Sequence, residues 1–292
     1  MQGSMPGADC TQINRRKLVL AAAALLAPGF AKPRSTFRGV ALGVQSYSFR
    51  DRPLDEAIAA MAKIGFGACE LSGVHLEPRL RAAELRQWRL TVPLDHFETA
   101  GRKLRQAGIE PGVLTYNLGS PPHPEAEISR GFEMAKALGA KAISSSTKLN
   151  VVPGLDAAAK RYKMRVGLHN HSTIRPEEVT TPDDFSAACR GRSDYIGITL
   201  DIGHFVAAGF DPAAYLREHQ AIVMGLHIKD RKKNQGPNVV FGEGDTPIGP
   251  VLRYIRDHAR KIPCYIEYEY AGPETAAEVG KCFDYCKHIL MS

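Results

Sequence analysis

The sequence has little of what marks specialised protein classes. Its most pronounced apolar run, Leu18–Leu26, is too short to span a bilayer as a stable anchor. It has only six cysteines, and the most closely spaced pair, Cys282 and Cys286, has neither a usual zinc spacing nor a usual disulfide spacing. Glycine and proline are dispersed, and no motif typical of RNA- or DNA-reading proteins is present. These absences argue against a membrane-embedded protein, a disulfide-stabilised scaffold and a nucleic-acid reader.

What is present is the composition of an ordinary globular domain. The chain has 292 residues, of which 44% are apolar and 24% are charged. The formal net charge is +7, but lysine and arginine are interleaved with glutamate and aspartate along the predicted helices. We therefore expect a mixed, solvated surface, no nucleic-acid partner, and no membrane association after removal of any signal.

The N-terminus has the pattern of an export signal. The basic segment Asn14–Lys17 precedes the apolar run, and small residues follow at Ala27–Ala31. The pair Arg15 and Arg16 resembles a twin-arginine signal. We expect residues 1–31 to be this signal, residues 32–292 to be the mature domain, and the protein to be periplasmic or otherwise exported. The alternative is an amphipathic N-terminal helix of the mature domain.

From about residue 40 a strand–loop–helix unit recurs. Each expected strand is a short, mostly continuous apolar run, as in parallel sheets that are buried on both faces. A glycine closes several of the expected helices before the next strand, at Gly65, Gly108 and Gly139. The expected strands are Ala41–Ser46, Ala68–Leu71, Gly112–Tyr116, Ala142–Ser145, Arg165–His169, Gly197–Asp201, Val223–Ile228 and Tyr265–Glu269.

Helix signals lie between these runs. Amphipathic helices are expected at Asp55–Lys63, Leu94–Gln106 and Glu125–Leu138. Three further helix starts have a cap residue followed by proline, at Thr181, Asp211 and Thr246. Alternating strands and helices predict a single (β/α)₈ TIM barrel without an internal linker. The rival open doubly wound sheet is disfavoured, because the segment after the first strand is not a glycine-rich phosphate loop.

Polar residues gather at the ends of the last four expected strands. His169, Asp201, His227 and Glu267 are separated by 32, 26 and 40 residues, about one strand–helix unit each. In a barrel such residues meet at the carboxyl ends of the strands, where active sites lie. Any one of them taken alone is more typical of a helix cap or a loop hydrogen bond. Two imidazoles and two carboxylates together favour a borderline divalent ion such as Mn²⁺, Zn²⁺, Fe²⁺ or Co²⁺.

These motifs resemble the sugar phosphate isomerase/epimerase family, whose members are also described as xylose-isomerase-like barrels. The resemblance covers about residues 40 to 290. The segment Leu168–His171 is most similar to the branch that includes inosose dehydratase and enzymes acting on keto-sugars. The motifs that carry the resemblance are Leu42–Phe49, Glu70–Gly73, Leu200–His204, His227–Asp230, Gly242–Asp245 and Ile266–Glu267.

The resemblance implies a metal held by His169, Asp201, His227 and Glu267. We expect one ion, Mn²⁺ first and Zn²⁺, Fe²⁺, Co²⁺ or Mg²⁺ as alternatives. It also implies a small carbohydrate substrate, with substrate contacts from three residues. These are His204, Gln45 and Glu70. The ketose epimerases of the family move the proton with two glutamates, one of which stands where this chain has His169. The chain therefore departs from their two-glutamate mechanism.

The expected chemistry is removal of a proton next to a carbonyl and formation of a metal-stabilised enediolate. Isomerisation, epimerisation or elimination of water then follows. The candidate bases are Glu267, His171 and Glu70, and His171 is expected to titrate near neutrality.

Three further residues near the strand ends have open roles. Lys229 binds a substrate oxygen or pairs with Asp230, and Glu243 faces substrate or caps its loop. Glu269 is a reserve metal ligand, because it is two residues from Glu267 on the same strand face.

Two other functions are consistent with such a chain. One is a periplasmic sugar-binding or catalytically degenerate barrel. The other is an abasic-site-type endonuclease, but that class needs extra ligands on strands two to four, and Thr115–Asn117 and Ser144–Ser146 do not supply them. By resemblance, the substrate is expected to be a glycoside or its 3-keto derivative, and a homo-oligomer is possible.

Overall fold

The computed structural model describes residues 35–119 and 122–292. The predicted signal, residues 1–31, lies outside the described residues and stays a prediction. Among the helices that the structure describes, none is long and apolar enough to cross a membrane.

Eight parallel strands close into a barrel, because the first of them pairs with both the second and the last. A short antiparallel strand, β1 (Thr36–Phe37), is added to the first barrel strand and was not expected from the sequence. The predicted single (β/α)₈ barrel is confirmed. The barrel strands are β2 (Val40–Gln45), β3 (Ala68–Leu71), β4 (Glu110–Thr115), β5 (Ala142–Ser145), β6 (Arg165–His169), β7 (Ile196–Asp201), β8 (Val223–Ile228) and β9 (Cys264–Ile266).

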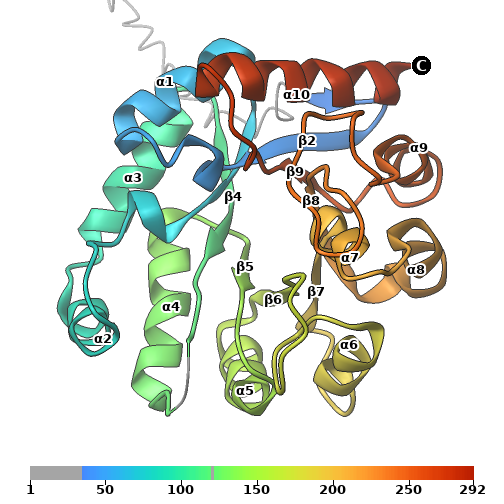
Figure 1. Ribbon diagram of the computed structural model, residues 1–292. Helices are drawn as coiled ribbons and strands as arrows, with labels where there is room; N and C mark the ends of the chain where they lie inside the picture. Colours follow the sequence, from blue (N-terminus) through green and yellow to red (C-terminus); the bar gives the residue numbers. More distant parts are fainter. Residues whose placement is uncertain (1–34, 120–121) are drawn as a thin grey trace, which may run out of the picture. The chain divides into compact units, whose positions relative to one another are not determined.

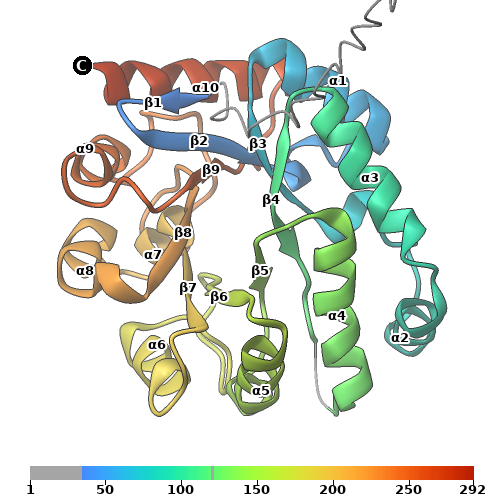
Figure 2. The same ribbon diagram turned by 180° about the vertical axis from the view of Figure 1, so that it is seen from behind.

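Helices cover the outside of these strands (Figures 1 and 2). The last one, α10, packs against both α9 and α1 and so completes the helical ring. The helices are α1 (Leu54–Ile64), α2 (Ala82–Thr91), α3 (Asp95–Gln106), α4 (Glu125–Leu138), α5 (Val152–Tyr162), α6 (Pro182–Cys189), α7 (Ile202–Ala207), α8 (Pro212–His219), α9 (Ile248–His258) and α10 (Thr275–Met291), with short 3₁₀ turns at Ser46–Phe49, Gly73–His75, Leu149–Val151 and Gln220–Ile222.

The helix α1 shows why the sequence pattern predicts these elements. Its apolar residues Ala57, Ile58 and Met61 recur at helical spacing and are buried against the barrel. Burying one large side chain of this kind stabilises the fold by about 1.5–3 kcal/mol. The helix ends at Gly65, whose φ of 106° is readily adopted only by glycine.

Several element boundaries differ from expectation by one or more residues, three of them as follows. The last strand ends at Ile266, so Glu267 and Glu269 follow the strand instead of lying within it. The third strand begins at Glu110, two residues early. Thr246 does not cap α9, because its hydroxyl accepts a hydrogen bond from the backbone N–H of Arg231 at 3.1 Å instead. The five cysteines in the described part of the chain are free thiols.

Candidate metal centre

Four side chains from successive strand ends meet at the carboxyl end of the barrel. His169 ends β6, Asp201 ends β7, His227 lies near the end of β8, and Glu267 follows β9. One nitrogen or oxygen atom from each lies within 4.8 Å of the other three. Nitrogen and oxygen ligands bind such an ion at about 2.1 Å, so they lie closer to one another than this when they share it. A contraction of the cluster would let these four residues hold one ion.

Two of these groups keep a buried polar atom without a hydrogen bond. They are His169 Nε2 and Asp201 Oδ2, which lie 3.7 Å apart. The other ring nitrogen of His169, Nδ1, contacts Ser146 Oγ at 3.1 Å. Buried polar atoms nearly always have partners. The unsatisfied pair therefore marks a place for a cation, and the set of two imidazoles and two carboxylates suits a borderline divalent metal.

Asp201 is positioned by contacts on both sides. The buried amide of Asn170 accepts from the backbone N–H of Asp201 at 2.9 Å and donates to its carbonyl at 3.1 Å. Asp201 Oδ1 accepts from the backbone N–H of His204 at 2.7 Å and so caps α7. Gly203 allows α7 to approach β8, because a Cβ there would lie 2.8 Å from the Lys229 carbonyl oxygen. One carboxylate oxygen of Asp201 is thus hydrogen-bonded to α7, and the other faces the cluster of four ligand residues.

His227 lies between two carboxylates. Its Nδ1 is 3.1 Å from Glu267 Oε2, and its Nε2 is 2.9 Å from Glu70 Oε2. Burial opposes the charged imidazole, but Glu70 and Glu267 outweigh it and raise the pKa of His227 well above 6.5. Glu70 is held in turn by a hydrogen bond from Thr115 Oγ1 at 2.9 Å. A carboxylate behind a histidine ligand orients the ring and increases its basicity.

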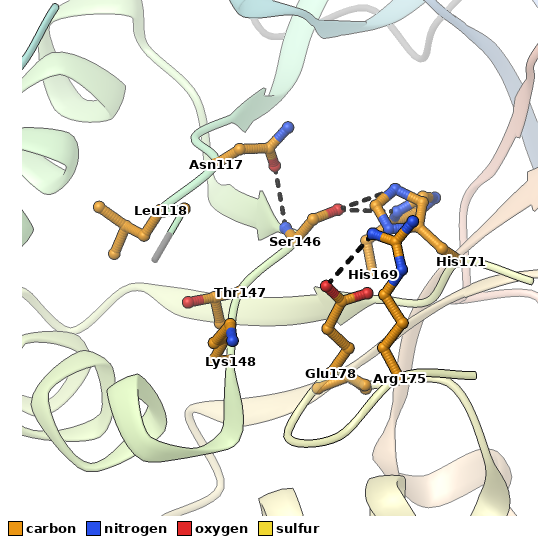
Figure 3. A pocket seen from close by; sticks show the side chains of 11 residues that line it. Asn117, Leu118, Ser146, Thr147, Lys148, His169, His171, Arg175 and Glu178 are labelled. Carbon is orange, nitrogen blue, oxygen red and sulfur yellow. Dashed lines mark hydrogen bonds and ion pairs between the residues drawn. The ribbon is translucent and has the colours of Figure 1, made fainter. Parts of the chain in front are cut away.

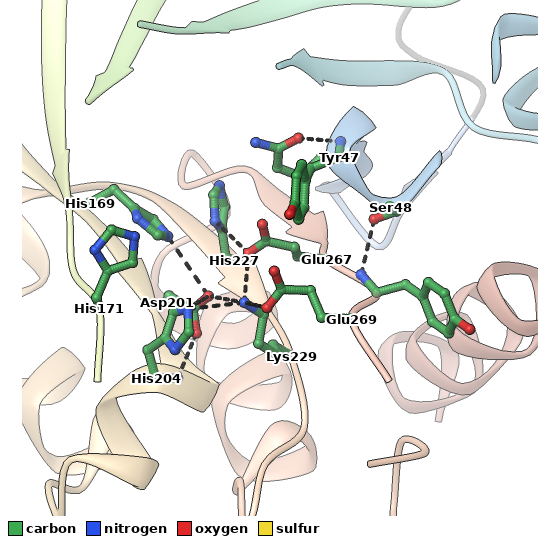
Figure 4. A network of polar contacts seen from close by, with 12 residues as sticks. Tyr47, Ser48, His169, His171, Asp201, His204, His227, Lys229, Glu267 and Glu269 are labelled. Carbon is green, nitrogen blue, oxygen red and sulfur yellow. Dashed lines mark hydrogen bonds and ion pairs between the residues drawn. The ribbon is translucent and has the colours of Figure 1, made fainter. Parts of the chain in front are cut away.

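Lys229 supplies the fixed positive charge of the centre. Its Nζ lies 3.1 Å from Asp201 Oδ2, 3.0 Å from Glu267 Oε2 and 2.5 Å from Glu269 Oε2 (Figure 4). The contact with Asp201 is an ion pair by distance, although that oxygen makes no hydrogen bond. Burial opposes the ammonium charge, but the three carboxylates raise the pKa of Lys229. The same ammonium, with His227, holds the pKa of Glu267 below its usual range against the effect of burial.

A cavity of about 320 Å³ opens above these groups. Each residue of its wall carries a polar group, which suits a hydroxylated ligand. The lining residues are Gln45, Tyr47, Ser72, Thr115, Asn117, Ser144, Ser146, His169, His171, His204, His227, Glu267 and Glu269.

A second cavity of about 330 Å³ adjoins the first. The two share four wall residues, Asn117, Ser146, His169 and His171 (Figure 3). On its far side the second cavity is lined by charged side chains, among them Lys148 and the ion-paired Arg175 and Glu178.

Residues 58–285 match the family model of the xylose isomerase-like TIM barrel. The chain belongs to this family. Solved structures agree with the family in fold. The 3-keto-D-glucoside 4-epimerase of E. coli, in its apo form, is 15% identical, with a TM-score of 0.65 over 85% of this chain and 99% of that one. A search of curated protein sequences found no significant match.

Two further solved structures are similar barrels, one named for a bound zinc atom and the other for a dehydratase. The IolI protein with a bound zinc atom is 16% identical, with a TM-score of 0.62 over 87% of this chain and 98% of that one. The probable 3-DHS dehydratase from Bacillus anthracis is 15% identical, with a TM-score of 0.61 over 83% and 97%. At these identities the likeness shows the fold of the xylose isomerase-like family and no more.

The structure divides the predicted substrate residues of this family member into two groups. Gln45 and His204 line the first cavity, together with the candidate base His171. Glu70 and Lys229 are buried behind His227 and Asp201 and are not on the cavity wall. From these positions Glu70 and Lys229 can orient the metal ligands and balance their charge, but they do not reach the substrate cavity.

The structure also decides the alternatives for two loop residues. Lys229 does not pair with Asp230, whose carboxylate instead accepts backbone N–H groups of Gly242 and Gly244 at 2.8 and 3.0 Å. Glu243 between them is exposed and lines neither of the two cavities. Glu269 pairs with Lys229, not with the four-ligand cluster.

One chemical expectation is wrong. His171 does not titrate near neutrality, because removal of water from around its ring, followed by the nearby charge of His169, lowers its pKa to about 4. The ring is therefore neutral at pH 7 and able to accept a proton.

Sequence reasoning missed several residues of the cavity and its support. Tyr47, Thr115, Asn117 and Ser146 follow or end predicted strands, which was the available signal, but they were considered only as metal ligands or not at all. Asn170 could have been found as a polar residue directly after a predicted strand.

Metal affinity is expected to rise with pH. In the metal-free protein both ring nitrogens of His227 face carboxylates, so binding of a cation to the ring must release a proton. The association constant for Zn²⁺ or Mn²⁺ should increase about tenfold per pH unit below the raised pKa of His227. Calorimetric titrations in buffers of different ionisation enthalpy would count the proton. Binding without proton release at pH 6.5 contradicts this account.

The same group gives the metal-free protein the opposite trend. A histidine whose pKa is raised on folding stabilises the fold below its unfolded value of 6.5, and this stabilisation is lost as pH rises through the folded pKa. Thermal unfolding in chelator should therefore show stability that falls as the pH rises from about 6.5 towards the folded pKa of His227, with no further loss from this group above it, whereas the metal-loaded protein should not show this fall.

Proposed function

We propose that this protein is a divalent-metal-dependent enzyme that moves a proton next to the carbonyl of a sugar, a keto-sugar or the keto form of a cyclic polyol such as inosose, as an isomerase, epimerase or dehydratase. The observation that carries the proposal is the convergence of His169, Asp201, His227 and Glu267 within 4.8 Å beneath a polar cavity. Structurally similar proteins named as a keto-glucoside epimerase and a dehydratase support this reaction class.

The four ligand residues would hold the ion, which when bound would supply the electrophile that polarises a substrate carbonyl. The chain's own residues supply the rest. The neutral ring of His171 faces the cavity and accepts the proton. Gln45, whose amide is fixed by Thr115 Oγ1 at 3.0 Å and the Tyr47 N–H at 2.7 Å, orients hydroxyl groups on the opposite wall.

The size of the site supports a substrate longer than one sugar ring. The reacting ring would occupy the first cavity, and the second cavity beside it would take an attached group. Because His169, His171, Asn117 and Ser146 border both cavities, one ligand can extend from one to the other. This favours the 3-keto derivative of a glycoside, which carries the carbonyl that the reaction needs, over a free monosaccharide.

The endonuclease alternative has little support. Among the residues that the structure describes, one cluster of three or more potential metal ligands is found, and it consists of the four residues above. A three-zinc site would need further ligands on β3 to β5.

Hydrogen exchange in D₂O tests the function directly. Metal-loaded protein is incubated with 3-keto-glycosides, ketohexoses and inosose, and NMR and mass spectrometry follow deuterium uptake or loss of water. We expect exchange that requires the metal, is unchanged in the exposed-site control Glu56→Gln, and falls about a hundredfold or more in His171→Gln.

Two results would overturn the proposal. Exchange that persists in excess chelator would exclude a metal requirement. Sugar binding detected by calorimetry without exchange of any substrate hydrogen would identify a binding or catalytically degenerate barrel instead.

A further inference from the structure

Two glutamates lie just beyond the end of the barrel sheet. The pairing of β9 with β2 and with β8 ends at Ile266, and the backbone N–H of Glu267 donates to the Ile228 carbonyl at 3.0 Å. Glu267 and Glu269 nevertheless both reach the Lys229 ammonium, at 3.0 and 2.5 Å. Side chains two residues apart lie on the same side only while the backbone stays extended. Contacts other than strand pairing must therefore hold the backbone after Glu267.

These contacts come from the turn that follows β2, residues 46–50. Ser48 Oγ accepts a hydrogen bond from the backbone N–H of Tyr268 at 2.9 Å (Figure 4). Arg50 Nη1 donates to the carbonyl of Tyr268 at 3.0 Å. The N–H belongs to the peptide bond after Glu267, and the carbonyl belongs to the peptide bond before Glu269. Two side chains of one turn thus fix the peptide planes beside both glutamates.

Ser48 holds the backbone on both sides of Glu267. Its side chain is fully buried, and its hydroxyl also donates to the Ile266 carbonyl, at a longer distance of 3.4 Å. Without the hydroxyl, the Tyr268 N–H would lose its acceptor, and buried backbone N–H groups are nearly always paired. The segment would have to shift to find another acceptor, and the carboxylate of Glu267 would move with it.

Glu267 is one of the four residues of the candidate metal centre. We propose that Ser48 and Arg50 are positioning residues, which hold Glu267 where a divalent metal can bind it. Neither of them lines the first cavity, so they act through the backbone of Tyr268 and not by contact with substrate. The role in metal binding rests on the proposed function, whereas the two contacts with Tyr268 do not.

Metal titrations compare two buried hydroxyl groups of the same turn. Ser46 is as fully buried as Ser48, but its Oγ accepts from the backbone N–H of Ser72 at 2.8 Å, after β3. Calorimetry on the full chain should show that Ser48→Ala binds Zn²⁺ or Mn²⁺ about tenfold to a hundredfold more weakly than wild type. Ser46→Ala should bind like wild type. Equal affinities in the two variants would overturn the positioning role.

Amide hydrogen exchange tests the contact itself in metal-free protein. A buried, hydrogen-bonded amide exchanges only when its segment opens. In Ser48→Ala the Tyr268 amide should exchange about tenfold faster than in wild type or more, while the Ser72 amide keeps its protection. Ser46→Ala should show the reverse. An equally protected Tyr268 amide in Ser48→Ala would refute the proposal.

Arg50 gives a second test, which also serves if Ser48→Ala does not fold. Arg50→Met removes the donor to the Tyr268 carbonyl and should weaken metal binding about tenfold. Arg50→Lys keeps a cationic donor and should restore most of the affinity. Arg52→Met is the control, because Arg52 pairs with Asp51 and should leave metal binding unchanged. Wild-type affinity in Arg50→Met would overturn the role of Arg50.

The fate of the proposed function is separable from these results. Metal binding that weakens in Ser48→Ala, in a protein that exchanges no substrate hydrogen, would refute the proposed function and leave the positioning role in place. A wild type that binds neither Zn²⁺ nor Mn²⁺ would refute the positioning role together with the metal centre.

Discussion

Asp201→Ala is expected to abolish metal binding. Asp201 is fully buried, its Oδ2 has no hydrogen bond, and it lies 3.7 Å from the equally unsatisfied His169 Nε2. The substitution removes one anionic ligand and one of the two buried atoms that have no hydrogen bond. The affinity for Zn²⁺ or Mn²⁺ should fall by more than about a hundredfold, as measured by elemental analysis of protein purified without chelator and by calorimetry.

A second substitution separates ligand loss from damage to the fold. Asp201 Oδ1 also caps α7, and loss of a cap costs about 0.5–2 kcal/mol. Asp201→Asn keeps an acceptor for the His204 N–H but removes the charge, so it should fold nearly as well as wild type and still bind metal poorly. Asp284→Ala, an exposed position on α10, should bind like wild type. Full metal content in both Asp201 variants, or none in the wild type after addition of Mn²⁺ and Zn²⁺, would refute the metal centre.

Lys229→Met is expected to destabilise the metal-free protein and to strengthen metal binding. The Lys229 side chain is 2% exposed and neutralises Asp201, Glu267 and Glu269. Removing one partner of a buried ion network costs about 3–5 kcal/mol, because the remaining charges stay buried without compensation. In chelator, the variant should therefore unfold at a clearly lower temperature than wild type.

The gain in metal affinity has an electrostatic cause. The ammonium of Lys229 lies within 3.1 Å of carboxylate oxygens of two proposed ligands, Asp201 and Glu267, so it repels a divalent cation placed among them. Without it, affinity for Zn²⁺ or Mn²⁺ should rise at least about tenfold, even with strong screening by the protein. Calorimetry and thermal melts with and without metal would measure both effects.

The control for this prediction is Lys63→Met, which removes an exposed lysine of α1 and should change neither quantity. Unaltered stability in chelator would show that Lys229 is not the counter-ion of the carboxylates. Weaker metal binding in Lys229→Met would show that the lysine supports the ion instead of competing with it.

The barrel could be predicted because the sequence patterns that indicate its strands and helices are local. Continuous apolar runs such as Val223–Ile228 indicate strands buried on both faces, and helices such as Glu125–Leu138 have their own periodicity. The sites at strand ends followed from the fold, since parallel strands bring their carboxyl ends to one rim. That is why His169, Asp201, His227 and Glu267 could be selected from the sequence before their distances were known.

Spacing along the chain was enough to predict the fold class and the residues that the barrel would bring together, because both depend on where strands and helices begin and end. The contacts that these residues make depend on the folded molecule. The tertiary structure placed Glu70 behind His227, paired Lys229 with three carboxylates and not with Asp230, and brought Arg231 to His204. These contacts join groups 27 to 157 residues apart, and side-chain reach and competition for partners select them. No periodic pattern in the sequence predicts these side-chain contacts.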